Sequence, residues 1–271
     1  MIRLLAAGLA LICLVLVTTG SGLGPLRALL RPEGGGLPPA MFVEDTLPAL
    51  QPLHQSDAYT PSDASRGESR LRQIGIWPLR SSWYEWVPAE MPPKAVVVLL
   101  HGTGRDGLSV LDMWRETARA HDLLLIAPNG AGQGWSTTRP ARIEAIVRAA
   151  TEAHGVAPTG LFLFGHSDGA VLAQAVLNAA DPGIWAGAAL HAGYLDAGKI
   201  GSGRNGAPLR LWLGTEDHLF SPAGARHSLQ RMAAIGHPAE LVLVSGHTHW
   251  FYDIGPQIAA NALDWFSSLA P

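Results

Sequence analysis

Residues 161–177 read LFLFGHSDGAVLAQAVL, which is an apolar run, the pentapeptide GHSDG and a second apolar stretch with helical spacing. Strand, G-x-S-x-G and helix in this order are the setting of a nucleophile elbow, a turn so tight that its serine is held in a strained backbone conformation. Gly165 and Gly169 stand two residues before and two residues after Ser167, where strand and helix leave no room for a side chain. The sequence therefore predicts a Ser167 hydroxyl that projects at a helix N-terminus, where the helix dipole favours negative charge.

Apolar runs of strand length alternate with stretches of helical spacing on both sides of this turn. We expect strands at residues 83–88, 95–100, 123–127, 161–164, 186–190, 209–213 and 240–244. We expect helices at residues 108–120, 142–153, 170–177, 223–235 and 256–269. Alternation of this kind predicts an α/β fold with a doubly wound, mainly parallel sheet and helices on both faces. Ligands bind such sheets at the carboxyl ends of the strands, so the chemistry belongs in the loops that follow them.

Candidate partners for the serine follow the later strands. A serine hydroxyl is a weak nucleophile that needs a base, and the base needs a carboxylate to orient it. Glu216 and Asp217 both follow the strand at residues 209–213, and we favour Asp217 because a G-T-x-D turn is common at this place. His247 and His249 both follow the last strand, and only one of them can be the base. These residues come in the order serine, acid, histidine along the chain.

Backbone N–H groups near the serine are the candidate donors to an oxyanion. One donor should come from Asp168, the residue after the nucleophile, and the other from the loop after the first buried strand. That loop reads HGT at residues 101–103, so Thr103 N–H is the expected second donor. We expect His101 to shape the loop through hydrogen bonds in the core.

The remaining histidines suggest no further chemistry. The H-x-H pattern of His247 and His249 could share a metal ion, but no cluster of further ligands follows, so we expect neither a metal nor a cofactor. His166 is expected to be a neighbour of the nucleophile, because its side chain leaves the elbow in another direction. His218 is expected to be a loop residue with at most a role at the rim of a substrate site.

Bulk composition narrows the function classes. The chain has 271 residues, a formal net charge of −3 and 15% charged residues, so nothing in its electrostatics supports nucleic-acid binding. Cys13 is the only cysteine, which excludes an intramolecular disulfide and a zinc site with several thiolates. The sequence does not determine the oligomeric state.

The N-terminus predicts export. Residues 1–22 combine Arg3 with a long apolar run, as in a signal peptide or a membrane anchor, and the pattern does not separate the two. Residues 23–70 are rich in glycine, proline and serine, and we expect an irregular linker there. The catalytic domain is expected over residues 71–271, in a periplasmic, secreted or membrane-anchored protein.

Several short motifs recur together in this chain. They are Val87–Pro88, Pro93–Gly102, Ala127–Gly130, the serine elbow, Trp185–Gly187 and Gly214–Asp217. Over about residues 83–266 they resemble the polyhydroxybutyrate depolymerase and feruloyl-esterase-like branch of the α/β-hydrolases. Asp168 stands where that branch often has alanine. A depolymerase-like G-H-x-W-P segment would select His247 as the base. Residues 246–252 instead resemble the G-x-x-H-x-aromatic-aromatic segment of S-formylglutathione hydrolases, which selects His249. We favour His249.

The resemblance implies a serine carboxylic-ester hydrolase that works through an acyl-enzyme. The span between Ser167 and Asp217 holds no long insertion, so we expect a small or absent lid and small short-chain or aryl esters as substrates. A serine peptidase or acyltransferase with the same triad is the alternative within the enzyme class. A noncatalytic envelope protein that binds ligands through residues such as Trp83, Trp86 and Trp250 is the alternative outside it.

Overall fold

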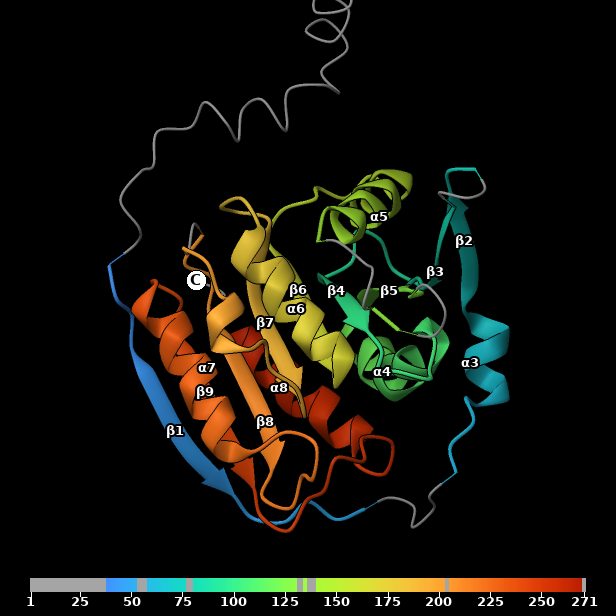
Figure 1. Cartoon of the computed structure of the whole chain (residues 1–271). Coiled ribbons are helices and arrows are strands. Elements are labelled where there is room, and N and C mark those ends of the chain that lie inside the picture. Colours follow the sequence, from blue (N-terminus) through green and yellow to red (C-terminus); the bar gives the residue numbers. More distant parts are fainter. Residues whose placement is uncertain are drawn as a thin grey trace, which may run out of the picture. The chain divides into compact units, whose positions relative to one another are not determined.

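A nine-stranded sheet with the strand order β1-β9-β8-β7-β6-β4-β5-β3-β2 is the centre of the fold (Figure 1). The computed structural model describes residues 38–52, 58–76, 80–130, 134–135, 140–202 and 205–269. The strands are β1 (Phe42–Leu47), β2 (Arg70–Ile74), β3 (Ser81–Trp86), β4 (Ala95–Leu100), β5 (Leu123–Pro128), β6 (Leu161–His166), β7 (Trp185–His191), β8 (Leu209–Gly214) and β9 (Ala239–Val244). Only β2 with β3 and β3 with β5 pair antiparallel among these strands, and every other pair is parallel.

Helices cover both faces of the sheet (Figure 1). They are α3 (Asp63–Glu68), α4 (Gly107–His121), α5 (Pro140–Ala153), α6 (Asp168–Ala179), the 3₁₀ turn η1 (Ala197–Lys199), α7 (Pro222–Ala234) and α8 (Gly255–Leu269). Side chains of α5, α6 and α7 share one apolar cluster, and side chains of α4 and α8 share another. These two clusters lie on opposite faces, which makes the sheet the middle of three layers.

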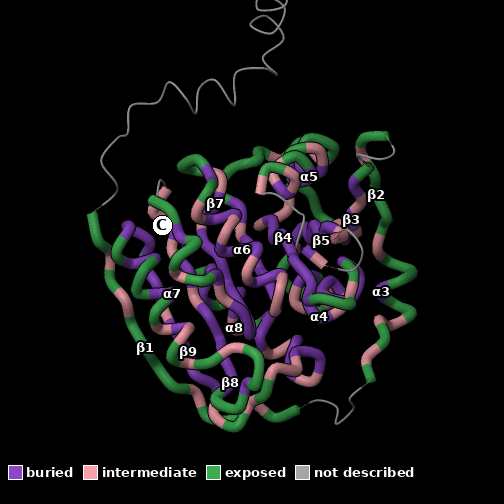
Figure 2. The backbone as a smooth tube through the Cα atoms, in the orientation of Figure 1, coloured by how far each residue is buried: buried purple, intermediate pink, exposed green. Residues whose placement is uncertain are grey.

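Strand β4 shows why a continuous apolar run predicts a buried strand. Val96, Val98 and Leu100 belong to the first cluster, whereas Val97 and Leu99 belong to the second. Successive side chains of a strand point to opposite faces, so a strand covered on both faces needs an apolar residue at every position. Figure 2 shows the same burial along the neighbouring central strands.

The predicted doubly wound, mainly parallel fold is confirmed. Each predicted strand and helix is present, with ends within a few residues of those expected from the sequence. Local signals fix several helix starts. Asp106 caps α4 by accepting a hydrogen bond from Ser109 N–H at 3.0 Å, and Ser221 caps α7 just before Pro222 at its first turn.

The prediction of an irregular linker over residues 23–70 is wrong for part of that stretch. β1 adds a parallel edge strand beside β9, α3 forms a short helix, and β2 begins at Arg70. β1 reads FVEDTL, and its four central residues are exposed, so it has no apolar face that a sequence pattern could reveal. Residues 37–271 form one compact unit that extends N-terminally beyond the predicted boundary at residue 71.

The N-terminal segment at residues 1–22 lies outside the described residues, and its role stays a prediction. Among the helices that the structure describes, none is long and apolar enough to span a bilayer.

Candidate active site

Ser167 stands on the turn between β6 and α6, as the sequence predicts. Its backbone has φ 55° and ψ −121°, a conformation that costs a non-glycine residue free energy and marks functional sites. A Cβ on Gly165 would lie 2.4 Å from Gly169 O, and a Cβ on Gly169 would lie 2.2 Å from Leu100 O. Both positions therefore require glycine, because the elbow presses the strand, the helix and the end of β4 together.

His249 lies between the serine and an acid. The Ser167 hydroxyl donates to His249 Nε2 at 2.9 Å, and His249 Nδ1 donates to Asp217 Oδ2 at 2.9 Å. Ser167 follows β6, Asp217 follows β8, and His249 follows β9, so three parallel strands bring together residues that are far apart in the chain. The hydroxyl, the imidazole and the carboxylate are within the distances that covalent catalysis would need.

The Asp217 carboxylate is buried and held from several sides. Its Oδ1 accepts the backbone N–H groups of Leu219 at 2.8 Å and Phe220 at 2.9 Å. Burial alone would raise the pKa of Asp217, but the hydrogen bonds from His249, Phe220 and Leu219 outweigh it and lower that pKa below its ordinary value. Asp217 is therefore a fixed negative charge against the Nδ1 face of His249.

The alternatives to these residues contact other groups. Glu216 is exposed, and its backbone N–H donates to His247 O at 3.0 Å. His247 Nε2 lies 3.2 Å from His191 Nε2, and neither the serine nor the acid is among its hydrogen-bond partners in the described structure. His218 is exposed, with its ring edge-on to His249 at 6.1 Å. The geometry favours His249 over His247 and Asp217 over Glu216.

Three further imidazoles form a row, which we call the histidine chain: His166, His191 and His247. His166 Nδ1 is 3.0 Å from His191 Nδ1, and His191 Nε2 is 3.2 Å from His247 Nε2. Each nitrogen pair needs one hydrogen, so neutral rings must all donate in the same direction along the row. Burial lowers the pKa of His166 to about 3 and that of His247 to about 4, and it lowers the pKa of His191 well below its usual range.

His191 was not among the residues expected at this site. It ends β7, which lies between β6 and β8, so its side chain reaches the edge of the sheet where Ser167 and Asp217 also lie. A polar residue at the end of an otherwise apolar strand, as in the sequence AALH, was the available signal.

The expected donors to an oxyanion lie beside the serine. A Cβ on Gly102 would lie 3.3 Å from Ser167 Cβ, which places the main chain before Thr103 against the nucleophile. Among the described residues, the backbone N–H groups of Thr103 and Asp168 donate to no backbone acceptor. The Asp168 side chain faces this loop, since its Oδ2 accepts Thr103 Oγ1–H at 3.2 Å and Trp135 N–H at 2.9 Å.

His101 supports the loop from behind. Its Nε2 accepts Gly130 N–H at 3.0 Å, and its Nδ1 lies 2.8 Å from Gly102 O. Trp135 Nε1–H donates to His101 O at 2.7 Å and so holds the main chain at the start of the same loop. Burial lowers the pKa of His101, so the ring is a neutral part of the core. Among the described residues, no three side chains of the metal-ligating types converge on one point.

Neither the protein-family models nor the curated proteins contain a match to this chain. Solved structures do match it. The esterase PE8 is 21% identical over 67% of this chain and 97% of that one, with a TM-score of 0.57. An acetyl xylan esterase from Aspergillus awamori is 15% identical over 74% of this chain and all of that one (100%), with a TM-score of 0.58. A puromycin-hydrolysing peptidase from Mycobacterium tuberculosis is 19% identical over 78% of this chain and 41% of that one, with a TM-score of 0.60.

Identities this low establish the architecture and leave the activity open, because one fold supports many reactions. The matches cover two thirds or more of this chain with TM-scores of 0.57 to 0.60, so they share its fold. The chain has the α/β-hydrolase fold.

Proposed function

We propose that this protein is a serine carboxylic-ester hydrolase in which Ser167, His249 and Asp217 are the catalytic residues. The observation that carries the proposal is the pair of 2.9 Å hydrogen bonds that join the serine hydroxyl, the imidazole and the carboxylate in series. A chance arrangement would not also place the serine on a strained turn at a helix N-terminus.

The reaction follows from the geometry. Ser167 Oγ attacks the ester carbonyl while His249 Nε2 takes its proton, and Asp217 stabilises the imidazolium that forms. The N–H groups of Thr103 and Asp168 stabilise the oxyanion of the tetrahedral intermediate. His249 then protonates the leaving alkoxide, and the same base activates the water that hydrolyses the acyl-enzyme.

We infer that the substrates are small short-chain or aryl esters, in keeping with the resemblance to polyhydroxybutyrate depolymerases and feruloyl esterases. The support is the short connection from the elbow to Asp217, which contains α6, β7, η1 and β8 and no additional helical lid in its described part. Hydrolysis of p-nitrophenyl acetate, butyrate and palmitate tests the inference. Faster turnover of acetate or butyrate is expected, and a preference for palmitate would contradict it.

Amide hydrolysis or acyl transfer is the second candidate, and the similarity to the puromycin-hydrolysing peptidase favours it. The same acyl-enzyme would form, and only the leaving group or the acceptor would differ. Matched ester and amide substrates with one acyl group separate the two activities. We expect kcat/KM for the ester to exceed that for the amide, and the reverse order would favour a peptidase.

The Ser167→Ala variant tests the proposal as a whole. It should lose p-nitrophenyl acetate hydrolysis and should no longer react with a fluorophosphonate probe, because both reactions need the nucleophilic oxygen. An unlabelled, inactive wild-type protein would instead favour a noncatalytic binding protein.

We also propose that residues 1–22 direct export of the protein or attach it to a membrane, on the strength of their apolar sequence. The intact mass of the protein recovered from the producing cell, in its membrane and soluble fractions, distinguishes cleavage from anchoring.

A further inference from the structure

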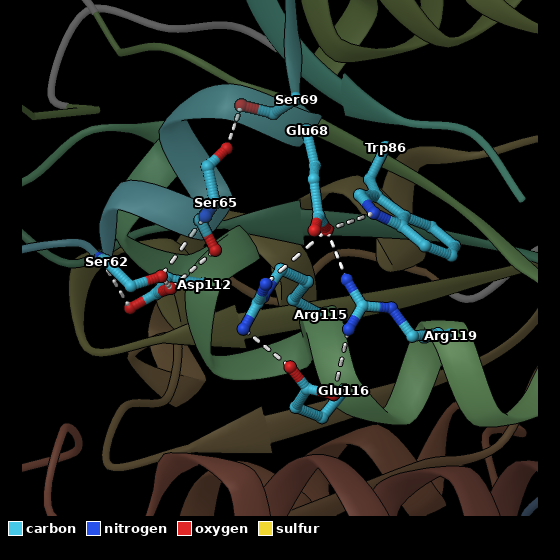
Figure 3. Close-up of polar contacts among 9 residues, drawn as sticks. All are labelled: Ser62, Ser65, Glu68, Ser69, Trp86, Asp112, Arg115, Glu116 and Arg119. Atoms are coloured by element: carbon cyan, nitrogen blue, oxygen red, sulfur yellow. Dashed lines mark hydrogen bonds and ion pairs between the residues drawn. The ribbon is translucent and has the colours of Figure 1, made fainter.

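A segment before the central strands reaches from α4 to the candidate site. We call residues 58–69 the N-terminal arm (Figure 3). Asp112 of α4 binds it through four hydrogen bonds: Tyr59 Oη–H, Ser62 Oγ–H and Ser65 Oγ–H each donate at 2.5 Å, and Ser62 N–H donates at 3.3 Å. These bonds lower the pKa of Asp112 although burial alone would raise it, so the carboxylate remains charged and keeps its hold on the arm.

A second anchor holds the other end of the arm. Glu68 accepts hydrogen bonds from Arg119 at 2.5 Å, from Arg115 at 3.4 Å and from Trp86 Nε1–H at 3.4 Å (Figure 3). The arm is therefore fixed on α4 at both ends, from the start of α3 to its last turn.

Tyr59, near the start of the arm, reaches the loop that carries the base. Its ring stacks on Tyr252 with centroids 4.0 Å apart and planes at 14°. Arg105 Nη1–H donates to Tyr59 O at 3.0 Å. The Arg105 guanidinium also faces the rings of Tyr59, Trp250 and Tyr252 at 5.5, 5.5 and 4.9 Å.

Arg105 belongs to the loop that supplies one of the expected oxyanion donors. Its backbone N–H donates to Gly102 O at 3.3 Å and closes a turn around Thr103 and Gly104. Gly104 has φ 77°, a backbone conformation that favours glycine, and a Cβ there would meet nothing within 4 Å. No carboxylate pairs with Arg105 in the described part of the chain. Its guanidinium is instead stabilised by cation–π contacts with three aromatic rings and by a hydrogen bond to the Tyr59 carbonyl.

We propose that Arg105 and Tyr59 are positioning residues for the oxyanion hole, and that the N-terminal arm is part of the active site. Arg105 joins three segments: the Thr103 loop, the residues after His249 and the arm. Donors to an oxyanion act only when they are already aimed at the developing charge, so a loop freed from this clamp stabilises the transition state less. The proposal rests on the proposed ester hydrolysis.

Steady-state kinetics of full-length variants on p-nitrophenyl acetate test it. Arg105→Ala should lower kcat by between about tenfold and about a hundredfold, because a misaligned oxyanion donor loses part of its effect. The KM should change less than about threefold. Arg105→Lys keeps the charge but not the flat stack on the rings, and it should lower kcat severalfold. Tyr59→Ala should resemble Arg105→Ala, whereas Tyr59→Phe keeps the ring stack and should restore most of the activity.

Arg226→Ala is the matched control, because Arg226 of α7 is a partly exposed arginine that pairs with Glu44 of the edge strand β1. It should leave kcat unchanged. Arg105→Lys decides the test if the alanine variants do not fold. A kcat within twofold of wild type in Arg105→Lys and in every folded alanine variant overturns the inference while the proposed function stands. A wild-type protein that neither hydrolyses esters nor reacts with a fluorophosphonate overturns the proposed function, and this inference with it.

Discussion

A single histidine, His249, and the histidine chain lie at the same edge of the sheet, and their ring nitrogens contact different partners. His249 lies between the Asp217 carboxylate and the Ser167 hydroxyl. The histidine chain of His166, His191 and His247 is held together by nitrogen-to-nitrogen contacts between its own rings. The two groups are neighbours, since the ring centroids of His166 and His249 are 5.4 Å apart.

The difference shows how a partner sets the role of an imidazole. A buried carboxylate compensates the charge that His249 gains when it takes a proton, so this ring can act as a base. Within the described residues, no carboxylate hydrogen-bonds to the histidine chain, and burial lowers the pKa of each member and keeps it neutral. Because the histidine chain is neutral, it places no like charge beside the imidazolium of His249.

Removing one ring from each group gives the largest expected contrast. His249→Ala should lower kcat by between about 10⁴-fold and 10⁶-fold, because the serine loses its base. His247→Ala should lower kcat by less than about tenfold, because His247 contacts His191 and not the nucleophile. Ester hydrolysis by the two variants under identical conditions measures the contrast, and equal losses would remove the distinction between the groups.

Changing the carboxylate should give the next largest effect. Asp217→Asn should lower kcat by about 10⁴-fold, since the amide keeps the shape of the side chain but not the charge that fixes the tautomer of His249. Glu216→Gln is the matched control and should stay within twofold of wild type, because Glu216 is exposed. A larger loss in Glu216→Gln than in Asp217→Asn would reverse the assignment of the acid.

Acid should destabilise the protein through the histidine chain. The pKa of His166 is about 3 in the folded state and about 6.5 when unfolded, so below pH 6.5 the unfolded state binds a proton that the native state does not. Lowering the pH from 7 to 5 should cost about 2 kcal/mol of unfolding free energy for this residue alone. Urea denaturation at the two pH values measures it.

The control for the acid effect is His166→Phe, which keeps an aromatic ring against Phe251 but cannot titrate. This variant should be less stable at pH 7 and should lose about 2 kcal/mol less than wild type between pH 7 and pH 5. An unchanged pH dependence would show that the histidine chain does not govern the acid response.

The smallest effect is expected at His218. Its ring lies edge-on to His249 and has no hydrogen bond within the described structure. His218→Ala should change kcat/KM for p-nitrophenyl acetate by less than about threefold. A larger change confined to KM would indicate a contact with the substrate at the rim.

The centre of the fold could be predicted from the sequence because local and tertiary signals agree there. Strands covered on both faces must be apolar at every position, and the elbow needs glycine at two fixed places. Since the strands are parallel, their following loops meet at one edge, so the sequence could place Ser167 near the pair Glu216 and Asp217 and near the pair His247 and His249. It left the choice within each pair open, because that choice depends on which side chain points at the serine.

The edges of the fold carry no such agreement. β1 is exposed and contains two central acids, so only its pairing with β9 makes it a strand. The N-terminal arm depends on Asp112, which reads as an ordinary surface residue of a helix until Tyr59, Ser62 and Ser65 converge on it. The histidine chain likewise depends on contacts between the ends of β6 and β7 and the loop after β9, which no local pattern encodes.

Reaction with a fluorophosphonate probe, followed by peptide mapping, measures the reactivity of Ser167 directly. We expect one adduct on Ser167 in the wild type, the same adduct at a similar rate in His247→Ala, and almost none in His249→Ala. An adduct on another residue, or labelling of Ser167 that does not depend on His249, would contradict the assignment of an activated serine at this turn.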